Sequence, residues 1–456
     1  MISAKNTILL LFVLAFSCNP KTTQDRADSM GTASEVLFPE RAKSMAIYEV
    51  NIRQYTPEGT INAFSSHLPR LNALGVDILW LMPVQPVGIK NRKGSLGSYY
   101  SIRDYTQVNP DFGTLEDFKN LVQSAHDLGM LVILDWVANH TSFDHPWTEI
   151  KGYHTLDSAG NITMPVGTDW SDVADLNYEN ERMRVDMIEE LKWWVVETDI
   201  DGFRCDVAGM VPIDFWNAAK DSLDRVKDLF MLAEWDEPKM HDDAFHMSYA
   251  WGPHHWMNDV AKGHLSADSL ESLMLGDLDR YGERPFRMMF TTNHDENSWN
   301  GTVYERFGDA HKAFALWAFT VRGMPLIYSG QEAGLKKRLR FFEKDTIDFG
   351  NPELQSYYAT LLAIKHENEA LYNGEYGGGV TFLDDENSNV SSFQRSKNEN
   401  VVTVIINFSS EPQEIKLKED LADFVDEFTN RKIEIKSGES LSLAPFEYLI
   451  DLKNSL

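Results

Sequence analysis

Gly202-Phe203-Arg204-Cys205-Asp206 lies near the middle of the 456-residue chain, where an apolar run ends in polar residues. A second apolar run follows after a short helical interval and ends at Glu234. Alternate residues of a β-strand share a face, so Arg204 and Asp206 are predicted to point the same way while Cys205 faces the packing on the other side. Acids at strand ends are typical of barrel enzymes, whose active sites lie where the parallel strands end.

The two acids have different predicted environments. An arginine beside a carboxylate keeps it ionised at neutral pH, so Arg204 favours an ionised Asp206, which suits a nucleophile. An apolar setting between Ala233 and Trp235 can keep Glu234 protonated, which suits a proton donor. The alternative is a buried Arg–Asp ion pair plus an unrelated surface glutamate, since structural ion pairs perturb carboxylates too.

Further apolar runs end in the same way and carry a family resemblance. The run 131–134 leads to Asn139-His140, and the run 288–291 leads to Asn293-His294-Asp295. In residues, order and approximate spacing, these motifs resemble those of the α-amylase family of glycoside hydrolases, over roughly residues 44–454. Ordered motifs that match together are much more specific than any single motif.

The chain is predicted to be an α/β protein, because apolar strands alternate with helical stretches as in parallel βαβ units. The resemblance implies a (β/α)8 TIM barrel over residues 44–370, with a short insertion, domain B, after the third strand at about 140–178. Residues 371–456 read as a C-terminal antiparallel β-sandwich domain. The expected barrel strands are 46–50, 78–82, 131–134, 202–204, 230–233, 248–250, 288–291 and 326–328.

The resemblance also implies catalytic roles. Retaining hydrolysis of a glycosidic bond uses two carboxylates about 5–5.5 Å apart, one that attacks and one that protonates the leaving oxygen. Asp206 matches the family nucleophile, Glu234 the acid/base, and Asp295 the third carboxylate, which holds sugar hydroxyls. The positions that match family contacts to the substrate are Tyr100, His140, Arg204 and His294.

Some of these positions also have structural readings. Tyr100 has Tyr99 beside it, and either ring could serve only in packing. Asp104 and Asp135 match family positions as well, and we expect both to be structural partners rather than direct actors.

A structural Ca²⁺ is a second implication of the resemblance. Asn139 and Asp175 match positions at which many family members hold calcium, and their oxygen atoms suit that hard ion. The alternative is that Asn139 hydrogen-bonds the backbone of the insertion. Where many α-amylases have a lysine and a histidine after the nucleophile, this chain has Gly209-Met210. It thus departs from the family pattern at a position where the family backbone contacts calcium and the side chains contact the sugar. No organic cofactor is expected.

Composition limits the partners. The net charge of −28 opposes binding to nucleic acid or anionic membranes, because such partners need lysine and arginine to neutralise phosphates. A neutral α-glucan or maltooligosaccharide fits this charge. The sequence does not indicate an oligomeric state.

The N-terminus is predicted to be a targeting segment. Residues 1–18 combine Lys5 with a short apolar stretch, and Leu14-Ala15-Phe16-Ser17-Cys18 resembles a bacterial lipoprotein signal with a lipid anchor at Cys18. An ordinary secretory signal is the alternative, because Phe16 is large for that position. Residues 19–43 read as a tether. The protein is therefore expected to be exported, as an outer-membrane or cell-surface lipoprotein, or as a periplasmic or secreted protein.

Three functions compete at this point. The first is a retaining hydrolase of α-1,4-glucosidic bonds in starch-derived glucans or maltooligosaccharides. The second is a transglycosylase or isomerase of the same family, which product analysis would distinguish. The third is a non-catalytic glucan-binding relative, which the presence of Asp206, Glu234 and Asp295 together opposes. Because the insertion is short, short oligosaccharides are expected to be cleaved at least as efficiently as starch.

Overall fold

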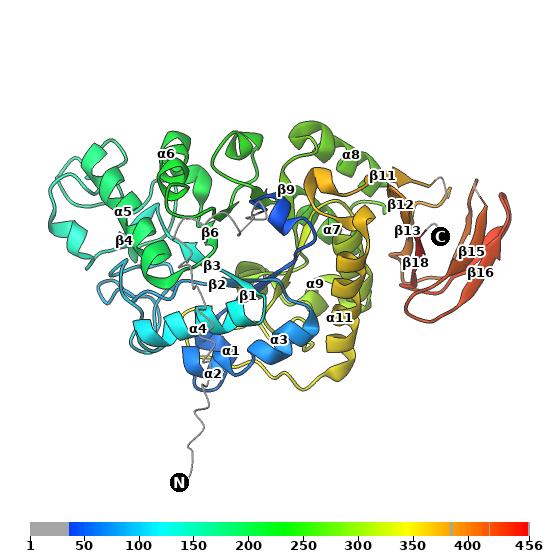
Figure 1. Cartoon of the computed structure of the whole chain (residues 1–456), viewed down its shortest axis with the longest axis horizontal. Helices are drawn as coiled ribbons and strands as arrows, with labels where there is room; N and C mark the ends of the chain where they lie inside the picture. Colours follow the sequence, from blue (N-terminus) through cyan, green and yellow to red (C-terminus); the bar gives the residue numbers. More distant parts are fainter. Residues whose placement is uncertain (1–35, 384–385, 419, 455–456) are drawn as a thin grey trace, which may run out of the picture. The chain divides into compact units, whose positions relative to one another are not determined.

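Eight parallel strands close into a barrel, which confirms the predicted fold (Figure 1). The computed structural model describes residues 36–383, 386–418 and 420–454, so the predicted signal, Cys18 and most of the predicted tether lie outside the described residues. Around the barrel the strand order is β1-β10-β9-β8-β7-β6-β3-β2. The strands are β1 (Ile47–Val50), β2 (Ile78–Leu81), β3 (Leu131–Trp136), β6 (Gly202–Cys205), β7 (Phe230–Ala233), β8 (Met247–Tyr249), β9 (Phe286–Met289) and β10 (Met324–Tyr328).

All eight strands overlap expected ones, and β10 begins two residues earlier than expected, as does β9. Strand β9 pairs through Phe286 with β8, and the chain has left the strand by Thr291 to enter the loop that carries the downstream motif. This correction matters for function, because it adds residues between the strand end and Asp295.

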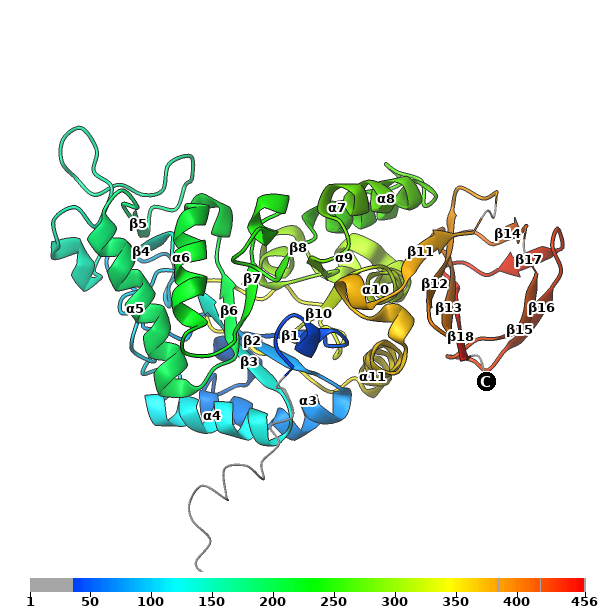
Figure 2. The same ribbon diagram turned by 45° about the horizontal axis from the view of Figure 1, so that its top comes forward.

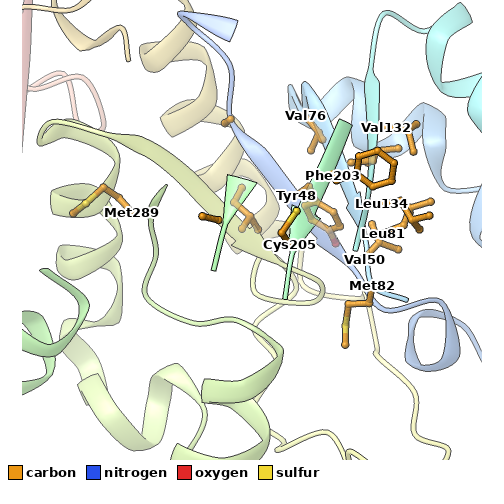
Figure 3. Close-up of a cluster of buried hydrophobic side chains, with 14 of the residues drawn as sticks. Tyr48, Val50, Val76, Leu81, Met82, Val132, Leu134, Phe203, Cys205 and Met289 are labelled. Atoms are coloured by element: carbon orange, nitrogen blue, oxygen red, sulfur yellow. The ribbon is translucent and has the colours of Figure 1, made fainter. Parts of the chain in front are cut away.

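Strand alternation divides the barrel side chains into two packing layers. Ile47, Trp80 and Ile133 belong to the cluster inside the barrel. Tyr48 and Phe203 belong to the cluster between the strands and the surrounding helices, part of which Figure 3 shows. As predicted, Cys205 faces this outer layer while Arg204 points inward.

Gly202 is required where β6 passes β7, since a Cβ at this position would lie 1.9 Å from the carbonyl oxygen of Phe230. A larger residue would therefore push apart the two strands that carry the acids.

Helices cover the outside of the barrel (Figure 1). Helix α4 shows how the sequence sets their limits: Thr114 and Asp117 form a reciprocal capping box, and Gly129 follows the helix with φ +80°. The helices are α1 (Ile52–Tyr55), α2 (Ile61–Ser65), α3 (Leu68–Leu74), α4 (Leu115–Asp127), α5 (Glu181–Thr198), α6 (Ile213–Leu223), α7 (Trp251–Ala261), α8 (Ser269–Tyr281), α9 (Val303–Phe307), α10 (His311–Thr320) and α11 (Pro352–Glu367).

Short helical turns complete the barrel loops. They are η1 (Glu40–Ala42), η2 (Pro146–Glu149), η3 (Ala208–Met210), η4 (Pro238–His241), the π-helix η5 (Glu296–Asn300), η6 (Gly308–Ala310), η7 (Glu369–Leu371) and η8 (Gly374–Tyr376).

The insertion after β3 contains one small antiparallel pair. Strands β4 (His140–Ser142) and β5 (Val173–Asp175) pair with His140 opposite Asp175. Figure 2 shows this pair beside α5, where Tyr153 donates a hydrogen bond to Asp186. The insertion thus has little regular structure of its own.

The C-terminal residues form antiparallel β-sheets with a separate core. One sheet has the order β11-β12-β13-β18, and two further pairs are β14-β17 and β15-β16. The strands are β11 (Gly379–Phe382), β12 (Val390–Lys397), β13 (Asn400–Asn407), β14 (Gln413–Lys416), β15 (Leu421–Val425), β16 (Lys432–Ile435), β17 (Ser440–Leu443) and β18 (Tyr448–Asn454). Contacts between Phe314 of α10 and Phe408 join this domain to the barrel.

The end of the predicted tether is folded. Phe38 is buried against Phe230 and its N–H donates to Asp228, while Ala42 is also buried. Residues 38–43 therefore belong to the folded unit that runs from Phe38 to the C-terminus. None of the helices in the described ranges has the length and apolarity needed to cross a bilayer.

Candidate active site

Strand register places two acids side by side. Asp206 and Glu234 are the first residues after β6 and β7, and the last residues of these strands, Cys205 and Ala233, are register partners. Neighbouring strands lie about 4.7–4.9 Å apart, so both acids emerge at the same level of the barrel, one strand spacing from each other. The backbone hydrogen bonds between β6 and β7 continue beyond the strand ends, because Glu234 N donates to the backbone oxygen of Cys205 at 3.0 Å.

Arg204 lies at the centre of the acidic cluster, fully buried. Its Nη1 donates to Asp135 Oδ1 at 2.8 Å and to Asp206 Oδ1 at 3.1 Å. Its Nη2 lies 2.7 Å from Glu234 Oε1, an ion pair that lacks the angular geometry of a hydrogen bond. The sequence pattern predicts that Arg204 lies beside Asp206 and that Glu234 has an apolar setting. Instead, one arginine bridges both acids, because β6 lies between β3 and β7.

Burial has a larger effect than Arg204 on the pKa of Asp206, contrary to the prediction that Arg204 favours an ionised Asp206. Burial and the neighbouring charge of Glu234 raise the pKa of Asp206, and burial also raises the pKa of Glu234 against the opposing effect of Arg204. Two carboxyl groups in this position act as one titrating unit. We conclude that the pair retains a proton more readily than free carboxyl groups, which acid–base chemistry near neutral pH requires.

Val207 fixes one oxygen of Glu234. Its backbone N–H donates to Glu234 Oε2 at 2.8 Å, and its backbone is left-handed, with φ +36°. A β-branched residue rarely adopts this conformation, which costs of the order of 1–3 kcal/mol. The strained turn therefore aims an amide at the acid that follows the neighbouring strand.

A second set of polar groups continues from the acids through a histidine. His294 Nδ1 lies 2.5 Å from Glu49 Oε1, and its Nε2 lies 2.8 Å from the hydroxyl of Tyr100. Burial opposes a charge on this ring, but the carboxylates of Asp295 and Glu49 raise the pKa of His294 to about 9. Protonated His294 thus donates from both nitrogens, and the Tyr100 hydroxyl in turn donates to Asp135 at 3.2 Å.

These groups surround a cavity of about 540 Å³. His140 lines it as a neutral ring, because burial lowers its pKa to about 3. Lys93 bridges to Asp172 of the insertion at 3.1 Å, which closes part of the cavity wall. The lining includes Tyr100, His140, Trp170, Asp206, Val207, Glu234, His294, Asp295, Trp299, Phe341 and Phe342.

Most predicted site residues meet at this cavity. Asp206, Glu234, Asp295, Tyr100, His140 and His294 line it, and Arg204 lies directly behind. Asp135 is a buried partner of Arg204, as expected, with Trp80 Nε1 donating to its Oδ2 at 3.1 Å. Asp104 instead accepts hydrogen bonds from Thr106 and Gln107.

The predicted calcium ligands lie in the insertion. Asn139 contacts the ring of His140 through its side-chain amide at 3.2 Å, and the half-buried Asp175 has a pKa raised by burial. Within the described ranges, the structure gathers no group of three or more His, Cys, Asp or Glu side chains that could hold a metal ion. The calcium site stays a prediction.

Two kinds of site residue escaped the sequence analysis. Glu49 is a single acid in the otherwise apolar strand β1, an irregularity that could have marked it as an inward-facing partner. Trp299 lies on the short π-helix η5, and Phe341 and Phe342 lie on the loop after β10. Neither segment has a periodic pattern, and their arrival at the cavity depends on the tertiary fold.

Comparison with known proteins identifies related chains. The family model "Alpha amylase, catalytic domain" matches residues 22–158 and 166–370, and the model "Maltogenic Amylase, C-terminal domain" matches residues 380–450. Alpha-amylase MalA of Haloarcula japonica is 28% identical over 83% of this chain and 57% of its own length. The chain thus spans less than two thirds of that relative.

Two solved structures match over almost their full length. A maltogenic alpha-amylase from Thermotoga neapolitana has a TM-score of 0.82 at 30% identity, covering 91% of this chain and 99% of its own. An alpha-amylase from Lactobacillus plantarum has a TM-score of 0.81 at 29% identity, covering 90% and 98%. The barrel and the C-terminal domain therefore both match amylase family models, and the two solved amylase structures share the fold of almost the whole chain.

Proposed function

Because the chain belongs to the α-amylase family of glycoside hydrolases, we propose that it hydrolyses α-1,4-glucosidic bonds with retention of configuration. The observation that carries this proposal is the placement of Asp206 and Glu234 at the same level of adjacent strands, bridged by Arg204. This proximity favours the separation of about 5–5.5 Å used by retaining enzymes over the wider gap that inverting enzymes need for a water molecule.

The reaction then has two steps. Asp206 attacks the anomeric carbon while Glu234 gives its proton to the departing glycosidic oxygen, so the carbon–oxygen bond breaks and a glycosyl ester forms. Glu234, now ionised, takes a proton from water, and the water oxygen attacks the same carbon and releases Asp206. Two displacements at one carbon restore its configuration.

The remaining groups hold the sugar. Asp295 accepts hydrogen bonds from sugar hydroxyls, while His294, kept protonated by its two carboxylate neighbours, holds Glu49 and Tyr100 in place beside the sugar. Neutral His140 contacts the same ring from the insertion side. Arg204 keeps charge from building up on the acid cluster, since it bridges Asp206, Glu234 and Asp135.

Substitution of the two acids tests the mechanism. Asp206→Asn should abolish turnover of every substrate, whereas Glu234→Gln should still form the glycosyl ester from a substrate with a good leaving group, because that group needs no proton. The control Asp127→Asn changes an exposed acid on α4 and should leave activity intact. Near-normal hydrolysis of maltooligosaccharides by Asp206→Asn would show that the nucleophile is wrongly assigned.

Product analysis tests the reaction class. Starch, maltooligosaccharides, cyclodextrin, pullulan and sucrose would each be incubated with the enzyme, and the products separated by chromatography. Shortened glucans support hydrolysis, whereas lengthened or rearranged products would place the enzyme with the transglycosylases or isomerases of the same family.

Two proposals concern the protein outside the reaction. Export with a lipid at Cys18 rests on the sequence Leu14–Cys18, and labelling with a fatty acid that Cys18→Ser abolishes would support it. Unlabelled protein would leave an ordinary secretory signal. Calcium held by Asn139 and Asp175 rests on the match to family positions, and a melting temperature that chelation leaves unchanged would contradict it.

A further inference from the structure

Trp299 is an exposed tryptophan at the rim of the cavity. Its side chain is 52% exposed, whereas five other tryptophans are fully buried, namely Trp80, Trp136, Trp194, Trp216 and Trp317. Large apolar side chains at the edge of a cleft commonly mark places where a ligand lies. The surroundings of Trp299 show whether it is merely a mobile surface residue.

The backbone of Trp299 is fixed by contacts of the element to which it belongs. It belongs to the π-helix η5, which begins directly after Asp295, and π-helices occur frequently at functional sites. Glu296 anchors the start of η5, because its Oε2 lies 3.1 Å from His254 Nε2 and its Oε1 accepts from Asn300 at 2.9 Å. Trp299 therefore has a fixed position relative to the third carboxylate.

The loop after β10 holds the element from the other side. Ser298 donates to the oxygen of Leu339 at 3.0 Å, and Leu339 N donates to Asn297 Oδ1 at 2.8 Å. The Trp299 ring packs on the rings of Phe341 and Phe342, with 5.2 Å and 5.9 Å between the ring centroids. The indole is thus supported before any ligand arrives, which lowers the entropic cost of binding.

Two cavities share these three aromatic rings. A second cavity of about 310 Å³ shares Trp299, Phe341 and Phe342 with the active-site cavity. Phe341 also stacks on Tyr100 at 6.3 Å, so aromatic rings continue from the centre of the site to the second cavity. The outer cavity has polar groups as well, on Arg340 and Glu343.

We propose that this second cavity is a subsite for an outer glucose unit of the α-glucan whose reacting unit lies beside Asp206, with Trp299 as its stacking platform. The proposal rests on the proposed function for the identity of the sugar. A glucose ring has apolar C–H faces and a polar edge, so an aromatic face flanked by Arg340 and Glu343 matches it. Trp299 then determines chain-length preference without taking part in bond cleavage.

A chain-length series tests the subsite. Wild type and Trp299→Ala would be compared on maltose and on each oligosaccharide up to maltoheptaose. We expect Trp299→Ala to lower kcat/KM for the long substrates about tenfold, as loss of a supported aromatic contact does, and for maltose less than about twofold. Trp299→Phe keeps a ring and should restore most of the loss. Leu275→Ala, an exposed apolar residue on α8, should leave the whole series unchanged.

A binding measurement keeps this test separate from the proposed activity. In the Asp206→Asn background, calorimetry with maltohexaose should show about tenfold weaker binding after Trp299→Ala, with unchanged circular dichroism. The subsite would be overturned if Trp299→Ala lowered kcat/KM equally for every oligosaccharide length, or for none of them. If the wild type hydrolysed none of these sugars, the proposed function would fail while calorimetry still decided the subsite.

Discussion

Val207 shows how a single strained residue can serve the chemistry of its neighbours. Its left-handed backbone turns the chain immediately after Asp206, and the same turn presents an amide to Glu234. An observed outlier of this kind is evidence that the surrounding structure enforces a geometry. Asp206 and Glu234, the proposed nucleophile and proton donor, are therefore coupled through the backbone as well as through Arg204.

Glu49 is predicted to keep His294 protonated. The pKa of His294 is raised to about 9, above its ordinary 6.5, so its charge stabilises the fold fully below pH 6.5 and that contribution disappears as the pH rises through about 9. Glu49→Gln removes one of the two carboxylates responsible and should lower the His294 pKa by about one unit or more. Titration of the imidazole signal by NMR measures this.

The resonance of His254 is an internal control for that titration. It pairs with Glu296, away from Glu49, and should not move. An unchanged His294 titration in Glu49→Gln would mean that Asp295 alone sets the charge.

Gly209 is predicted to be fixed by the ring of Trp235. A Cβ there would lie 2.0 Å from the Trp235 indole, so Gly209→Ala must displace the residue that follows Glu234. Overpacking of this kind typically costs about 1–3 kcal/mol, and we expect loss of kcat/KM together with lower stability. Urea unfolding and kinetics on maltotriose measure both.

Gly276→Ala is the matched control. Gly276 lies within α8 and has open space around it, so an alanine there should stabilise the protein by up to about 1 kcal/mol and leave kinetics unchanged. Equal behaviour of the two variants would contradict the close contact between Gly209 and Trp235.

At the scale of elements, the apolar runs predicted parallel strands that alternate with helices, and the resemblance to the α-amylase family predicted that eight of them form a barrel. The sequence also predicted which acids lie at the strand ends, since register follows from parallel pairing. It did not predict that Arg204 bridges both acids, because that depends on the lateral order of β3, β6 and β7. Nor did it predict the aromatic rim, whose loops approach each other only in the folded chain.

The junction between α10 and the C-terminal sheet depends on Arg395 of β12. This buried side chain donates to the carbonyl oxygens of Thr320 at 3.1 Å and Gly378 at 2.8 Å. Arg395→Met leaves these carbonyls without their charged donor and should destabilise the protein by about 1.5–3 kcal/mol, measured by urea unfolding. Short-substrate kinetics at low temperature should persist, because the junction is separate from the cavity.

Arg431→Met provides the comparison within the same domain. Arg431 pairs with Glu447 at the surface, where removal of an ion pair costs about 1 kcal/mol or less. A similar loss of unfolding free energy in both variants would show that the buried hydrogen bonds of Arg395 stabilise the protein no more than a surface ion pair does.

At the scale of the whole molecule, the small insertion is expected to favour short substrates. Loops beyond the strand ends build the binding cleft of a barrel enzyme, and here the insertion has one two-stranded sheet. We therefore expect kcat/KM for short α-1,4 oligosaccharides to be at least equal to that for soluble starch per reducing end released. A preference of about a hundredfold or more for starch, with a rapid fall in viscosity, would contradict this and indicate internal cleavage.

Cys205, on the outer face of the strand that precedes Asp206, is a built-in probe for local opening of the barrel. Its thiol is fully buried among the side chains under the helices, so an alkylating reagent reaches it only when β6 leaves its neighbours. Burial also raises the pKa of this thiol, which keeps it unreactive while the fold is closed. The rate at which Cys205 is alkylated in native buffer therefore counts the openings of the strand that carries the proposed nucleophile, and a bound oligosaccharide should slow it.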